Sequence, residues 1–498
     1  MTIVSHQTRA AEHQVVIVGS GPSGMMLAAE LTLADIDVVV VERRATQELE
    51  SPRSRGLHAR TIEALDQRGI ADRFLAEGTP MQVQAFAGIP LDISDFPTRH
   101  NYGLALLQSD FERIMAGWID ELGVRVVRQR DVTRFRQGDD QVEVIGADGT
   151  KLRAEYLVGC DGSRSVVRTT AGIDFAGWDA TVCWITAEVE MHEQPVFGLR
   201  GGGGIGPAAS GRVGVTLAET DTDHRFDEPT LDDLRAALIR VDGTDYGAHS
   251  PRFIARFTDT TRQAVSYRSG RVLLSGDAAH IHAPFGGQGL NLGVQDSVNL
   301  GWKLARVIRR TSPASLLDTY HAERHPVAAN VMHNTMAQRA LAATDDRTVA
   351  LKSIVTDLLA LDQPRIHLAA MISGLDIRYG PDGGHPMIGR RVPDLDLTTS
   401  TGRTRIYDYL HRAQPLLLVL DPGSELDATP WRDHVQHVAA GTTGPWELPV
   451  VGEVPAPSAL LIRPDGYVAW AGADDDPALH TALTTWFGEP RRQAAKLD

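Results

Sequence analysis

The strongest constraint on the fold of this chain is a glycine turn that directly follows a short apolar segment near the N-terminus. Residues Val15 to Val18 are all apolar, and Gly19 to Gly24 read Gly-Ser-Gly-Pro-Ser-Gly. A second apolar run, Val38 to Val41, ends at Glu42, about 20 residues after the turn. Strand, glycine turn, helix, strand and acid in this order predict a dinucleotide-binding βαβ unit, although a glycine turn in an unrelated α/β fold is the simpler alternative.

Each part of this motif has a chemical role. The three glycines Gly19, Gly21 and Gly24 supply a tight turn, close approach of the backbone to a pyrophosphate, and close packing of helix on strand. The pyrophosphate is expected at the N-terminus of the helix that begins near Pro22, where free N–H groups favour negative charge. Glu42 is placed to accept hydrogen bonds from ribose hydroxyls. The motif indicates a dinucleotide without saying which one.

Composition excludes several function classes. The 498 residues are enough for two or three domains, and the net charge of −15 disfavours binding to nucleic acid or to an anionic membrane surface. Only Cys160 and Cys183 are present, so neither a disulfide framework nor a four-thiolate metal site is expected. The polar N-terminus does not resemble a signal peptide, and no apolar run reaches the ~18 residues of a membrane span. We therefore expect a cytoplasmic protein without a membrane contact.

The pattern of apolar residues changes along the chain. Short alternating segments between about Trp178 and Val272, interrupted by one helix at about Leu231 to Ile239, predict an antiparallel sheet inserted into the nucleotide-binding domain. After this insertion the chain returns to a buried strand, and a new unit begins near residue 381. The predicted domains are 1–177 (with about 80–105 contributing to the substrate domain), 178–270, 271–380 and 381–498.

Three helices are expected from capping residues and periodicity. The first covers Asp110 to Leu122, with Asp110 as its N-terminal cap and Gly123 at its end. The second is a long helix over Gly293 to Ile308. The third segment, Leu316 to Thr344, is expected to be largely helical with a break at Pro326.

Two further motifs make the prediction more specific. Gly159 to Arg168 (Gly-Cys-Asp-Gly-Ser-Arg-Ser-Val-Val-Arg) follows one buried strand. Gly276-Asp277 follows another, and Pro284 to Asn291 (Pro-Phe-Gly-Gly-Gln-Gly-Leu-Asn) comes shortly after it. With the first glycine turn, these motifs resemble the three fingerprints of the FAD-dependent aromatic hydroxylases, the p-hydroxybenzoate hydroxylase-like class A flavoprotein monooxygenases. The resemblance covers about Val15 to Thr344.

This resemblance implies FAD as the bound cofactor, with NADPH or NADH as a transient co-substrate, since no second nucleotide fingerprint is present. It places Asp277 at the ribityl chain, although Asp277 could instead cap the turn that follows. Arg164 and Arg168 either hold their loop, meet phosphate or are simply solvated. Val132 is either a backbone contact to adenine or an ordinary strand residue. The predicted cofactor contacts are Gly19, Gly21, Ser23, Gly24, Glu42, Arg43, Arg55, Gln108, Val132, Asp161, Asp277, Pro284, Gly289, Leu290 and Asn291.

No catalytic residue is assigned. His280 and His282 are two positions apart, and no carboxylate or cysteine is spaced to complete a metal site with them, so no metal is expected. No nucleophile–histidine–acid arrangement is evident. His58 could act as a base towards a substrate phenol, but a structural role is the simpler alternative. A flavin C4a-hydroperoxide does not require a protein nucleophile: the protein keeps the hydroperoxide dry and directs it at the substrate. The helix after Gly289 is expected to stabilise negative charge on reduced flavin.

Within the family, the chain is most similar to the aromatic polyketide hydroxylases of antibiotic pathways, for example at Asp277 to His282 and Asn299 to Leu304. The segment Ile462 to Trp470 resembles their third, thioredoxin-like domain. No cysteine occurs after Cys183, so dithiol exchange is impossible in that domain, and a structural or interface role is expected.

The expected fold is α/β, with a Rossmann-like FAD-binding domain, an inserted antiparallel β-sheet substrate domain and a C-terminal thioredoxin-like domain. The expected activity is hydroxylation of a polycyclic aromatic or polyketide antibiotic intermediate, with molecular oxygen and NAD(P)H, by a monomer or homodimer. One alternative is a Baeyer–Villiger or antibiotic-inactivating monooxygenase on the same scaffold. A second alternative is a catalytically idle FAD-binding partner protein. A flavin-dependent halogenase is disfavoured, because its Trp-x-Trp-x-Ile-Pro signature does not occur.

Overall fold

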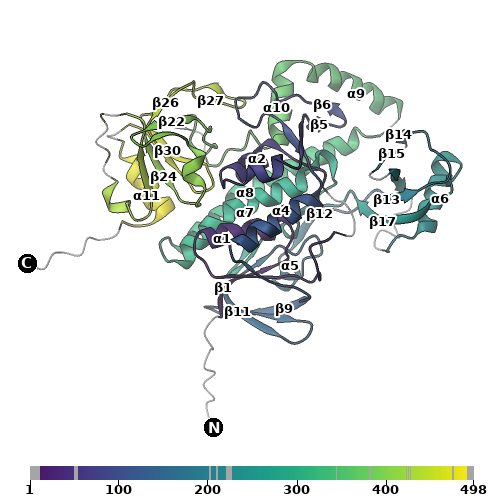
Figure 1. Ribbon diagram of the computed structural model, residues 1–498, viewed down its shortest axis with the longest axis horizontal. Coiled ribbons are helices and arrows are strands. Elements are labelled where there is room, and N and C mark those ends of the chain that lie inside the picture. Colours follow the sequence, from purple (N-terminus) through teal and green to yellow (C-terminus); the bar gives the residue numbers. More distant parts are fainter. Residues whose placement is uncertain are drawn as a thin grey trace, which may run out of the picture.

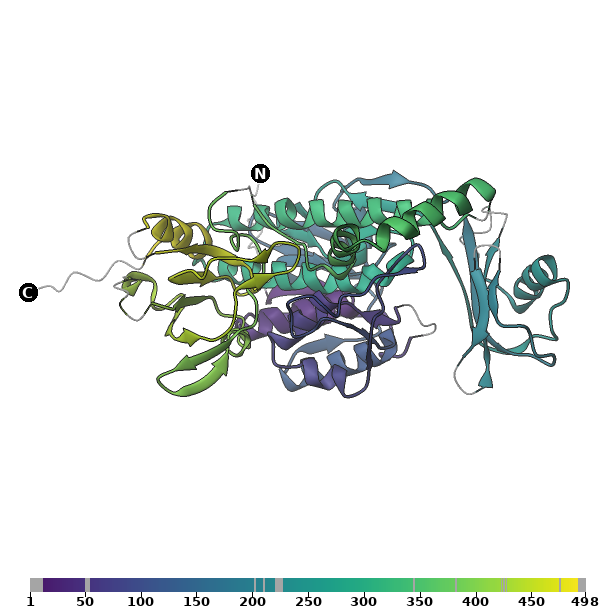
Figure 2. The ribbon, with the colours of Figure 1, turned by 90° about the horizontal axis from the view of Figure 1, so that it is seen from above.

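The computed structural model describes residues 12–49, 54–200, 203–208, 211–219, 227–343, 345–380, 383–421, 423, 426, 428–473 and 476–490. The chain forms a central α/β body with a separate β-sheet on one side and a C-terminal unit on the other (Figure 1). Seen from above, the sheet that contains β13 and β17 stands apart from the central body at the right, and the C-terminal unit lies at the left (Figure 2). Among the described residues, no helix combines the length and apolar character that crossing a membrane requires.

The central sheet is built around β1, whose residues Val15 to Val18 are buried. β1 pairs in parallel with β2 on one side and β11 on the other, so that Val15 lies opposite both Val38 and Tyr156. Strands buried on both faces have continuous apolar runs, which explains the sequence of β1 and β2. The sheet has the order β19-β20-β11-β1-β2-β8, with β10 and β9 added along β11. Its strands are β1 (His13–Val18), β2 (Val38–Val41), β8 (Arg125–Val127), β9 (Val132–Gln137), β10 (Val142–Gly146), β11 (Lys151–Gly159), β19 (Arg268–Ser269) and β20 (Val272–Leu274).

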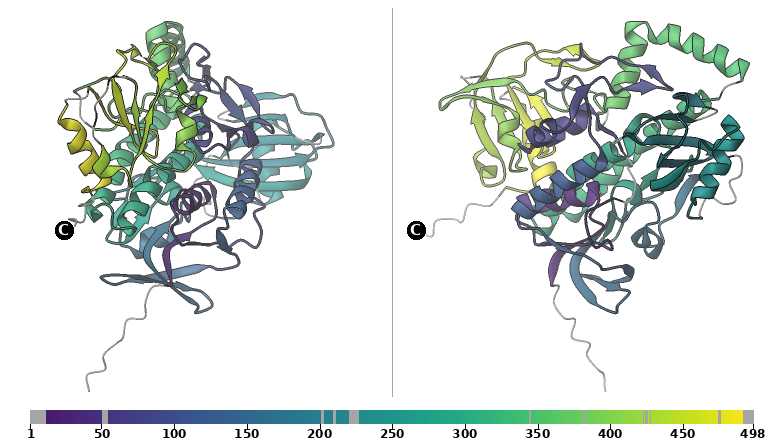
Figure 3. Two further views of the ribbon diagram at one scale, coloured as in Figure 1. Left: turned by 60° about the vertical axis from the view of Figure 1, so that its left-hand side comes forward. Right: turned by 45° about the vertical axis from the view of Figure 1, so that its right-hand side comes forward.

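Helices α1, α4, α7 and α8 lie together over this sheet (Figures 1 and 3). Glycines let α1 and α7 approach closely: a Cβ on Gly301 of α7 would lie 2.4 Å from the Cβ of Glu30 in α1. The helices of the body are α1 (Pro22–Leu33), α2 (Ala59–Asp66), α3 (Ala71–Leu75), α4 (Gln108–Glu121), α5 (Val166–Thr170), α7 (Gln288–Ile308), α8 (Asp318–Ala340), α9 (Asp346–Leu359) and α10 (Asp362–Ser373). Short 3-10 turns are η2 (Gly276–Ala278), η3 (Phe285–Gly287) and η4 (Ala314–Leu317).

Two of the predicted helix starts are wrong. α4 begins at Gln108, with Leu107 at its N-cap, so Asp110 lies within the first turn. The backbone N–H of Gln108 instead donates to the carbonyl of Ser54 (2.9 Å). A carbonyl of a neighbouring loop therefore satisfies one N–H group at the helix start, and a capping side chain is not used. α7 begins at Gln288 rather than Gly293, because Gly287 adopts a left-handed conformation (φ 62°) that ends the preceding turn.

The predicted break at Pro326 is also wrong. α8 continues through Pro326 from Asp318 to Ala340, while Thr344 lies outside the described residues. Pro326 is exposed. The missing N–H and the carbonyl that it would have bonded therefore face solvent, which lowers the cost of a proline within a helix.

The alternating segments after residue 178 form a five-stranded antiparallel sheet with the order β14-β15-β16-β13-β17. Helix α6 packs on one face, where Leu234 and Leu238 share a core with Ile185 and Val215. α6 runs on to Asp242, three residues beyond the predicted end, and stops at Gly243 with φ 80°. The elements are β13 (Cys183–Glu190), β14 (Gly198–Arg200), β15 (Gly203–Pro207), β16 (Val213–Glu219), α6 (Leu231–Asp242) and β17 (His249–Thr258).

Smaller sheets connect this insertion to the body. β12 (Phe175–Trp178), β18 (Thr261–Ala264) and β21 (His280–Ile281) form one of them, at the two chain crossings between the body and the insertion. The segments before and after α2 form two more within the body. Their strands are β3 (Gly56–Leu57), β4 (Thr79–Met81), β5 (Ala85–Phe86), β6 (Ile89–Pro90) and β7 (Gly103–Ala105).

The C-terminal unit contains a four-stranded sheet of order β25-β24-β29-β30, in which only the β24–β25 pair is parallel. A three-stranded sheet of β22, β23 and β26 lies beside it. The elements are β22 (Asp396–Thr399), β23 (Gly402–Arg405), η5 (Tyr407–Leu410), β24 (Leu416–Val419), η6 (Thr429–Trp431), β25 (Gln436–Ala439), β26 (Gly441–Thr442), β27 (Glu447–Leu448), β28 (Gly452–Glu453), β29 (Ala459–Ile462), β30 (Val468–Gly472) and α11 (Ala478–Phe487). Its likeness to thioredoxin and the four domain boundaries stay predictions.

The turn between β29 and β30 inserts charged side chains into the central body. Arg463 donates two hydrogen bonds to the carboxylate of Glu323 on α8 (2.6 and 2.8 Å), and Lys303 on α7 donates to the same carboxylate (2.7 Å). Asp465 accepts from Arg463 and from Asn299. These side chains are buried. We call Lys303, Glu323, Arg463 and Asp465 the hairpin ion cluster.

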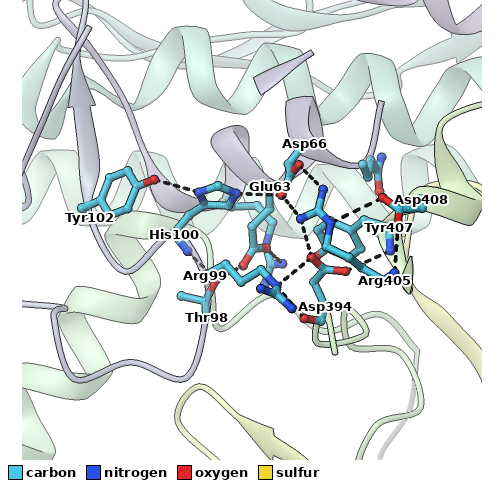
Figure 4. Close-up of polar contacts among 12 residues, drawn as sticks. Glu63, Asp66, Thr98, Arg99, His100, Tyr102, Asp394, Arg405, Tyr407 and Asp408 are labelled. Carbon is cyan, nitrogen blue, oxygen red and sulfur yellow. Dashed lines mark hydrogen bonds and ion pairs between the residues drawn. The ribbon is translucent and has the colours of Figure 1, made fainter. Parts of the chain in front are cut away.

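A second polar contact joins the two units through α2 (Figure 4). Arg405 donates to both carboxylate oxygens of Asp66 (3.0 and 2.9 Å) and to Asp394 (2.8 Å). The other side of Asp66 meets His100 (2.9 Å), whose second ring nitrogen lies 3.0 Å from the hydroxyl of Tyr102. Burial opposes ionisation of Asp66, but its bonds to His100 and Arg405 outweigh this and lower its pKa. These are two of the charged sites that attach the C-terminal unit, and the ion pair of Arg391 with Glu63 on α2 (3.3 Å) is another.

The hairpin ion cluster predicts a specific acid sensitivity. Burial disfavours the Glu323 carboxylate, but Arg463 and Lys303 outweigh it and lower its pKa from 4.5 to about 2. A carboxyl whose pKa is lower in the folded state stabilises the fold above pH 4.5, and this contribution is lost as the pH falls towards 2. Between pH 7 and pH 3 the free energy of unfolding of the wild type should fall by about 2 kcal/mol more than that of Glu323→Gln. Urea unfolding at both pH values measures this, and an equal fall in the two proteins would contradict it.

Candidate functional site

The glycine turn Gly19 to Gly24 is packed tightly on one side and open on the other. A Cβ on Gly19 would lie 2.3 Å from the carbonyl oxygen of Cys160, at the end of β11, and one on Gly24 would lie 1.9 Å from the carbonyl of Gly19. A Cβ on Gly21 would meet no atom within 4 Å. Gly21 is also the N-cap of α1 and provides no side-chain cap. The backbone at Gly21 is thus accessible to a ligand at the start of α1.

Ser23 fills the space between two other glycines. Its Oγ would lie 2.3 Å from a Cβ on either Gly276 or Gly293. Its carbonyl accepts a hydrogen bond from Ser297 (2.8 Å). Ser23 therefore holds α1, η2 and α7 together, which places the first and third sequence motifs side by side.

Glu42 lies directly against the glycine turn. Its carboxylate accepts from the backbone N–H of Ser20 (2.7 Å) and of Arg44 (2.8 Å). Burial opposes ionisation, but the backbone N–H groups of Arg44 and Ser20 and the charge of Arg44 outweigh it and lower the pKa of Glu42. Glu42 is therefore an anion beside the turn. Arg43, the neighbouring predicted contact, is exposed.

A polar network around the buried Glu112, which sequence reasoning missed, joins this turn to α4. Glu112 on α4 accepts from Arg44 (3.2 Å), Gln47 (2.6 Å) and Gln108 (2.8 Å). Arg44 and Gln47 also donate to the carbonyl of Ser20. Gln108, a predicted contact, is thus tied to the glycine turn through Glu112. The partners are far apart in sequence, so no local pattern indicates this network.

Two other predicted contacts lie on neighbouring segments. The chain at Arg130 runs beside Glu42, since the N–H of Arg130 donates to the carbonyl of Glu42 (3.0 Å), and Val132 follows as the buried first residue of β9. Arg55 has an exposed side chain, and its carbonyl accepts from Leu106 (3.2 Å). Arg53 of the same loop lies outside the described residues.

The second motif lies against the first. Asp161 follows β11, and its Cα would be 3.2 Å from a Cβ on Gly19. Its carboxylate accepts from the hydroxyl of Ser165 (2.5 Å) and the N–H of Val167 (3.0 Å), so it binds the N-terminus of α5. Burial raises the pKa of Asp161 despite these bonds. The side chain anchors the loop locally.

The two arginines of this motif differ. Arg168 is buried and donates to the carbonyls of Ala278 (2.9 Å) and Ser163 (3.0 Å), with its guanidinium 3.7 Å from the ring centre of Phe175. It therefore holds the loop, one of the predicted alternatives, and connects it to η2. Arg164 is exposed.

Asp277 lies in η2 with an exposed side chain. The alternative that it caps this turn is wrong, because Ser275 occupies the N-cap and no side chain caps the turn. Its Oδ1 would lie 3.9 Å from a Cβ on Gly289, so Asp277 faces the start of α7. Asp296, which sequence reasoning missed, supports this turn by accepting from Gly276 (3.3 Å).

Asp296 is itself fixed by two buried partners. His280 Nε2 lies 2.6 Å from its Oδ2, and Arg324 Nε donates to its Oδ1 (2.7 Å). Burial opposes ionisation of Asp296, but Arg324 and His280 outweigh it and lower its pKa. The sequence points to this contact only through the histidine at position 280, whose ring bonds to Asp296.

The loop before α7 contains two consecutive left-handed glycines, Gly286 (φ 71°) and Gly287 (φ 62°). Asn291 holds this loop: its Oδ1 accepts from the N–H of His58 (2.8 Å), and its Nδ2 donates to the carbonyls of Gly287 (2.9 Å) and Gly56 (3.2 Å). Pro284 is exposed, and Gly289 and Leu290 are half-buried in the first turn of α7, which no side chain caps. The backbone is therefore free to approach a flat group.

His58 supports the same loop. Its Nε2 lies 2.7 Å from the carbonyl oxygen of Gly286, and burial lowers its pKa. A neutral imidazole bonded to the backbone matches the structural alternative for His58 better than a role as substrate base. Among the described residues, no group of three histidine, cysteine, aspartate or glutamate side chains could hold a metal ion.

Comparison with known proteins identifies two regions. Residues 12–335 match the FAD binding domain family, and residues 385–490 match the family described as aromatic-ring hydroxylase, C-terminal. The chain is 43% identical to 12-dehydrotetracycline 5-monooxygenase/anhydrotetracycline 6-monooxygenase of Streptomyces rimosus, over 96% of this chain and 99% of that protein. It is 41% identical to rifampicin monooxygenase of Rhodococcus hoagii, over 97% and 99%. The structure of OxyS anhydrotetracycline hydroxylase from Streptomyces rimosus superposes with a TM-score of 0.90, at 43% identity, over 96% of this chain and 99% of that one.

Proposed function

The chain belongs to the FAD-dependent aromatic-ring hydroxylases, a family of monooxygenases, and from this premise we propose that it hydroxylates a polycyclic aromatic or polyketide antibiotic intermediate. The family resemblance inferred from the three sequence motifs is thereby confirmed. NAD(P)H is proposed as the electron donor and molecular oxygen as the co-substrate. Bound FAD supplies the electron transfer and oxygen activation.

One observation carries this proposal. The helices that follow the first and third motifs, α1 and α7, both begin without a side-chain cap. The start of α1 at Gly21 is open to a pyrophosphate, with the Glu42 anion placed for ribose hydroxyls. The start of α7 follows the Gly286-Gly287 turn and favours negative charge on the flavin ring. Asp277 lies between them, where a ribityl chain would pass. A dinucleotide with a flat ring at one end fits this arrangement.

The protein's own groups orient and shield the reaction. Asn291 and His58 hold the loop 284–287, and Asp296 holds the Asp277 turn, so the cofactor-facing backbone is fixed before the substrate binds. Trp184 of the inserted sheet lies edge-on to Phe285 of this loop, with ring centres 6.1 Å apart, and helps to exclude water. The proposed cofactor contacts are those predicted from the sequence, with Arg43 and Arg55 reaching FAD through their exposed side chains.

A second candidate function is the oxidative inactivation of an antibiotic. It is favoured by the 41% identity to rifampicin monooxygenase, which is nearly as high as that to the anhydrotetracycline enzyme. Both functions use the same cofactor and differ in the product. Hydroxylation adds one oxygen to an intact ring system, whereas a Baeyer–Villiger insertion changes ring connectivity. Both reactions add one oxygen atom and give the same product mass, so NMR of the product separates the two. A cytoplasmic location and a monomer or homodimer remain our proposals.

The activity is tested by spectrophotometry. Purified protein should carry bound FAD, and anhydrotetracycline, the substrate named for a relative, should stimulate its NADPH oxidation. Repeating the assay with NADH in place of NADPH determines which electron donor the protein uses. Protein that binds no FAD would contradict the proposal. Bound FAD without substrate-stimulated oxidation would favour the idle FAD-binding alternative.

Gly21→Ala tests the placement of the pyrophosphate. The backbone at Gly21 (φ −84°) suits alanine and its Cβ would touch nothing, so the thermal stability of the apoprotein should be unchanged. The methyl group would occupy the position of the pyrophosphate, and we expect FAD affinity to fall by about 10- to 100-fold, or roughly 1.4–2.7 kcal/mol. Titration of apoprotein with FAD, followed by flavin fluorescence, measures this. Wild-type affinity in a folded variant would place the cofactor elsewhere.

A further inference from the structure

Three carboxamide side chains lie buried near the Gly286-Gly287 turn. Gln288 begins α7, and Asn334 and Gln338 lie one turn apart on α8. They are 3%, 5% and 2% exposed. Both polar atoms of Gln288 and of Asn334, and the Nε2 of Gln338, have no hydrogen-bond partner within the described part of the chain. We call these three residues the amide cluster.

The orientation of the cluster is set by Gln338. Its Oε1 accepts a hydrogen bond from the backbone N–H of Ala87 (3.1 Å), which directs the Nε2 group to the other side. That Nε2 would lie 3.4 Å from a Cβ on Gly286, and the Nε2 of Gln288 would lie 3.6 Å from the same point. Asn334 is four residues before Gln338 and so lies on the same face of α8. The amides of Gln288 and Gln338 therefore converge on the loop that we place beside the flavin ring, and Asn334 lies one turn along α8 from Gln338.

The unsatisfied atoms define what they can bind. They are three N–H₂ donors and two carbonyl acceptors, without a formal charge. Leaving such groups buried without partners is unfavourable, so a ligand that satisfies them is favoured. The nearby cation Arg339 pairs with Asp259 (3.5 Å) and lies 5.6 Å from the ring centre of Trp184. A ligand carboxylate would lose its hydration at the cluster without gaining a counter-ion.

Aromatic side chains also contact this loop. Trp184 of β13 stacks on Phe257 of β17, with ring centres 5.2 Å apart, and meets the edge of Phe285 in η3. Aromatic rings in offset or edge contact form a suitable surface for a further flat ring system. Flat aromatic surface together with mixed neutral donors and acceptors around one loop suits a polycyclic compound with ketone and hydroxyl groups along one edge.

We propose that the amide cluster binds the ketone and hydroxyl edge of an uncharged polycyclic aromatic substrate and thereby determines which substrates are accepted. This inference rests on the proposed function and deepens it, because it names the charge and the recognised groups of the substrate. The Nε2 of Gln338 donates to a substrate ketone. The carbonyls of Gln288 and Asn334 accept from substrate hydroxyls.

The test uses FAD-loaded protein and two matched probes, 1,8-dihydroxyanthraquinone and its carboxylated analogue 4,5-dihydroxyanthraquinone-2-carboxylate, with binding measured by calorimetry. We expect the wild type to bind the neutral probe at least about tenfold more tightly than the carboxylate. Asn334→Leu and Gln338→Leu should each weaken binding of the neutral probe about 5- to 15-fold, the effect of one lost hydrogen bond. FAD content should be unchanged in both variants.

Two further variants make the result decisive. Gln338→Glu keeps an acceptor for the N–H of Ala87 but removes the Nε2 donor. It should therefore weaken binding of the neutral probe as much as Gln338→Leu does. Asn330→Leu makes the same substitution as Asn334→Leu at an exposed position of α8 and should bind like the wild type. Wild-type affinity in the Asn334 and Gln338 variants, equal binding of the two probes, or binding of neither to FAD-loaded protein would overturn the inference. A wild type that takes up no FAD would instead overturn the proposed function, and this inference with it.

Discussion

Replacing Arg463 with methionine is expected to lower the free energy of unfolding by about 3–5 kcal/mol. Arg463 donates two hydrogen bonds to the buried carboxylate of Glu323 and also bonds to Asp465, and its guanidinium lies 4.5 Å from the ring centre of Trp486. Methionine has a similar length but no charge, so Glu323 and Asp465 would remain buried with only Lys303 as a cationic partner. The penalty is the cost of uncompensated buried charge rather than the strength of one ion pair. Chemical denaturation at pH 7 measures the change.

Arg73→Met is the matched control. Arg73 makes the same two-bond contact with Glu121, at 2.7 and 2.8 Å, but its side chain is 42% exposed. Exposed ion pairs contribute about 0–1 kcal/mol, so this variant should unfold almost as the wild type does. If the two variants lost the same stability, burial would not be the cause. The double variant Glu323→Gln with Arg463→Met should lose less than the sum of the single changes, because the two groups share one interaction.

Replacing Gly24 with alanine is expected to destabilise the protein by about 3 kcal/mol and to abolish FAD binding. A Cβ at Gly24 would lie 1.9 Å from the carbonyl oxygen of Gly19 and 3.4 Å from the Cβ of Cys160. The atom in the way belongs to the backbone, so it can move only if the glycine turn itself opens. That movement would displace the start of α1 from the end of β11. Thermal unfolding of the apoprotein and FAD titration measure the two effects separately.

Gly117→Ala is the same substitution as Gly24→Ala, but we expect it to raise the stability of the protein. Gly117 lies in the middle of α4, is exposed, and a Cβ there would meet nothing within 4 Å. Alanine at such a helix position should stabilise the protein by about 0.5–1 kcal/mol. A destabilised Gly117→Ala protein, or a Gly24→Ala protein with wild-type stability and FAD affinity, would show that the contacts around these glycines do not govern the response.

Local sequence was sufficient for the parts of this fold that local chemistry determines. The hydrophobic pattern predicts β1 and the position of Glu42, and the glycines predict a tight turn. All of these residues lie within one βαβ unit. The family was also identifiable, because three spaced motifs each carry their own backbone constraint.

Partners distant in sequence were not predictable. The sequence predicts Arg43 as a cofactor contact, but it gives no sign that Arg44, one position later, turns inward to Glu112, 68 residues away. Likewise, Asp296 supports the Asp277 turn although nothing near it in sequence suggests this. The helix starts at Gln108 and Gln288 are hard to predict for a related reason, because neither helix has a capping side chain. The loop carbonyl of Ser54 binds the N–H of Gln108, and the left-handed Gly287 precedes Gln288.

The insertion of the β29–β30 turn also affects how the protein is made. Arg463 is synthesised 140 residues after its partner Glu323. At 5–20 residues per second this delay is roughly 7–28 s, and the N-terminal part of a chain generally folds first. During that interval the nascent α7 and α8 present Glu323 to solvent with Lys303 as its only partner from the cluster. Codon usage and chaperone supply over the segment between them therefore bear on the yield of folded protein.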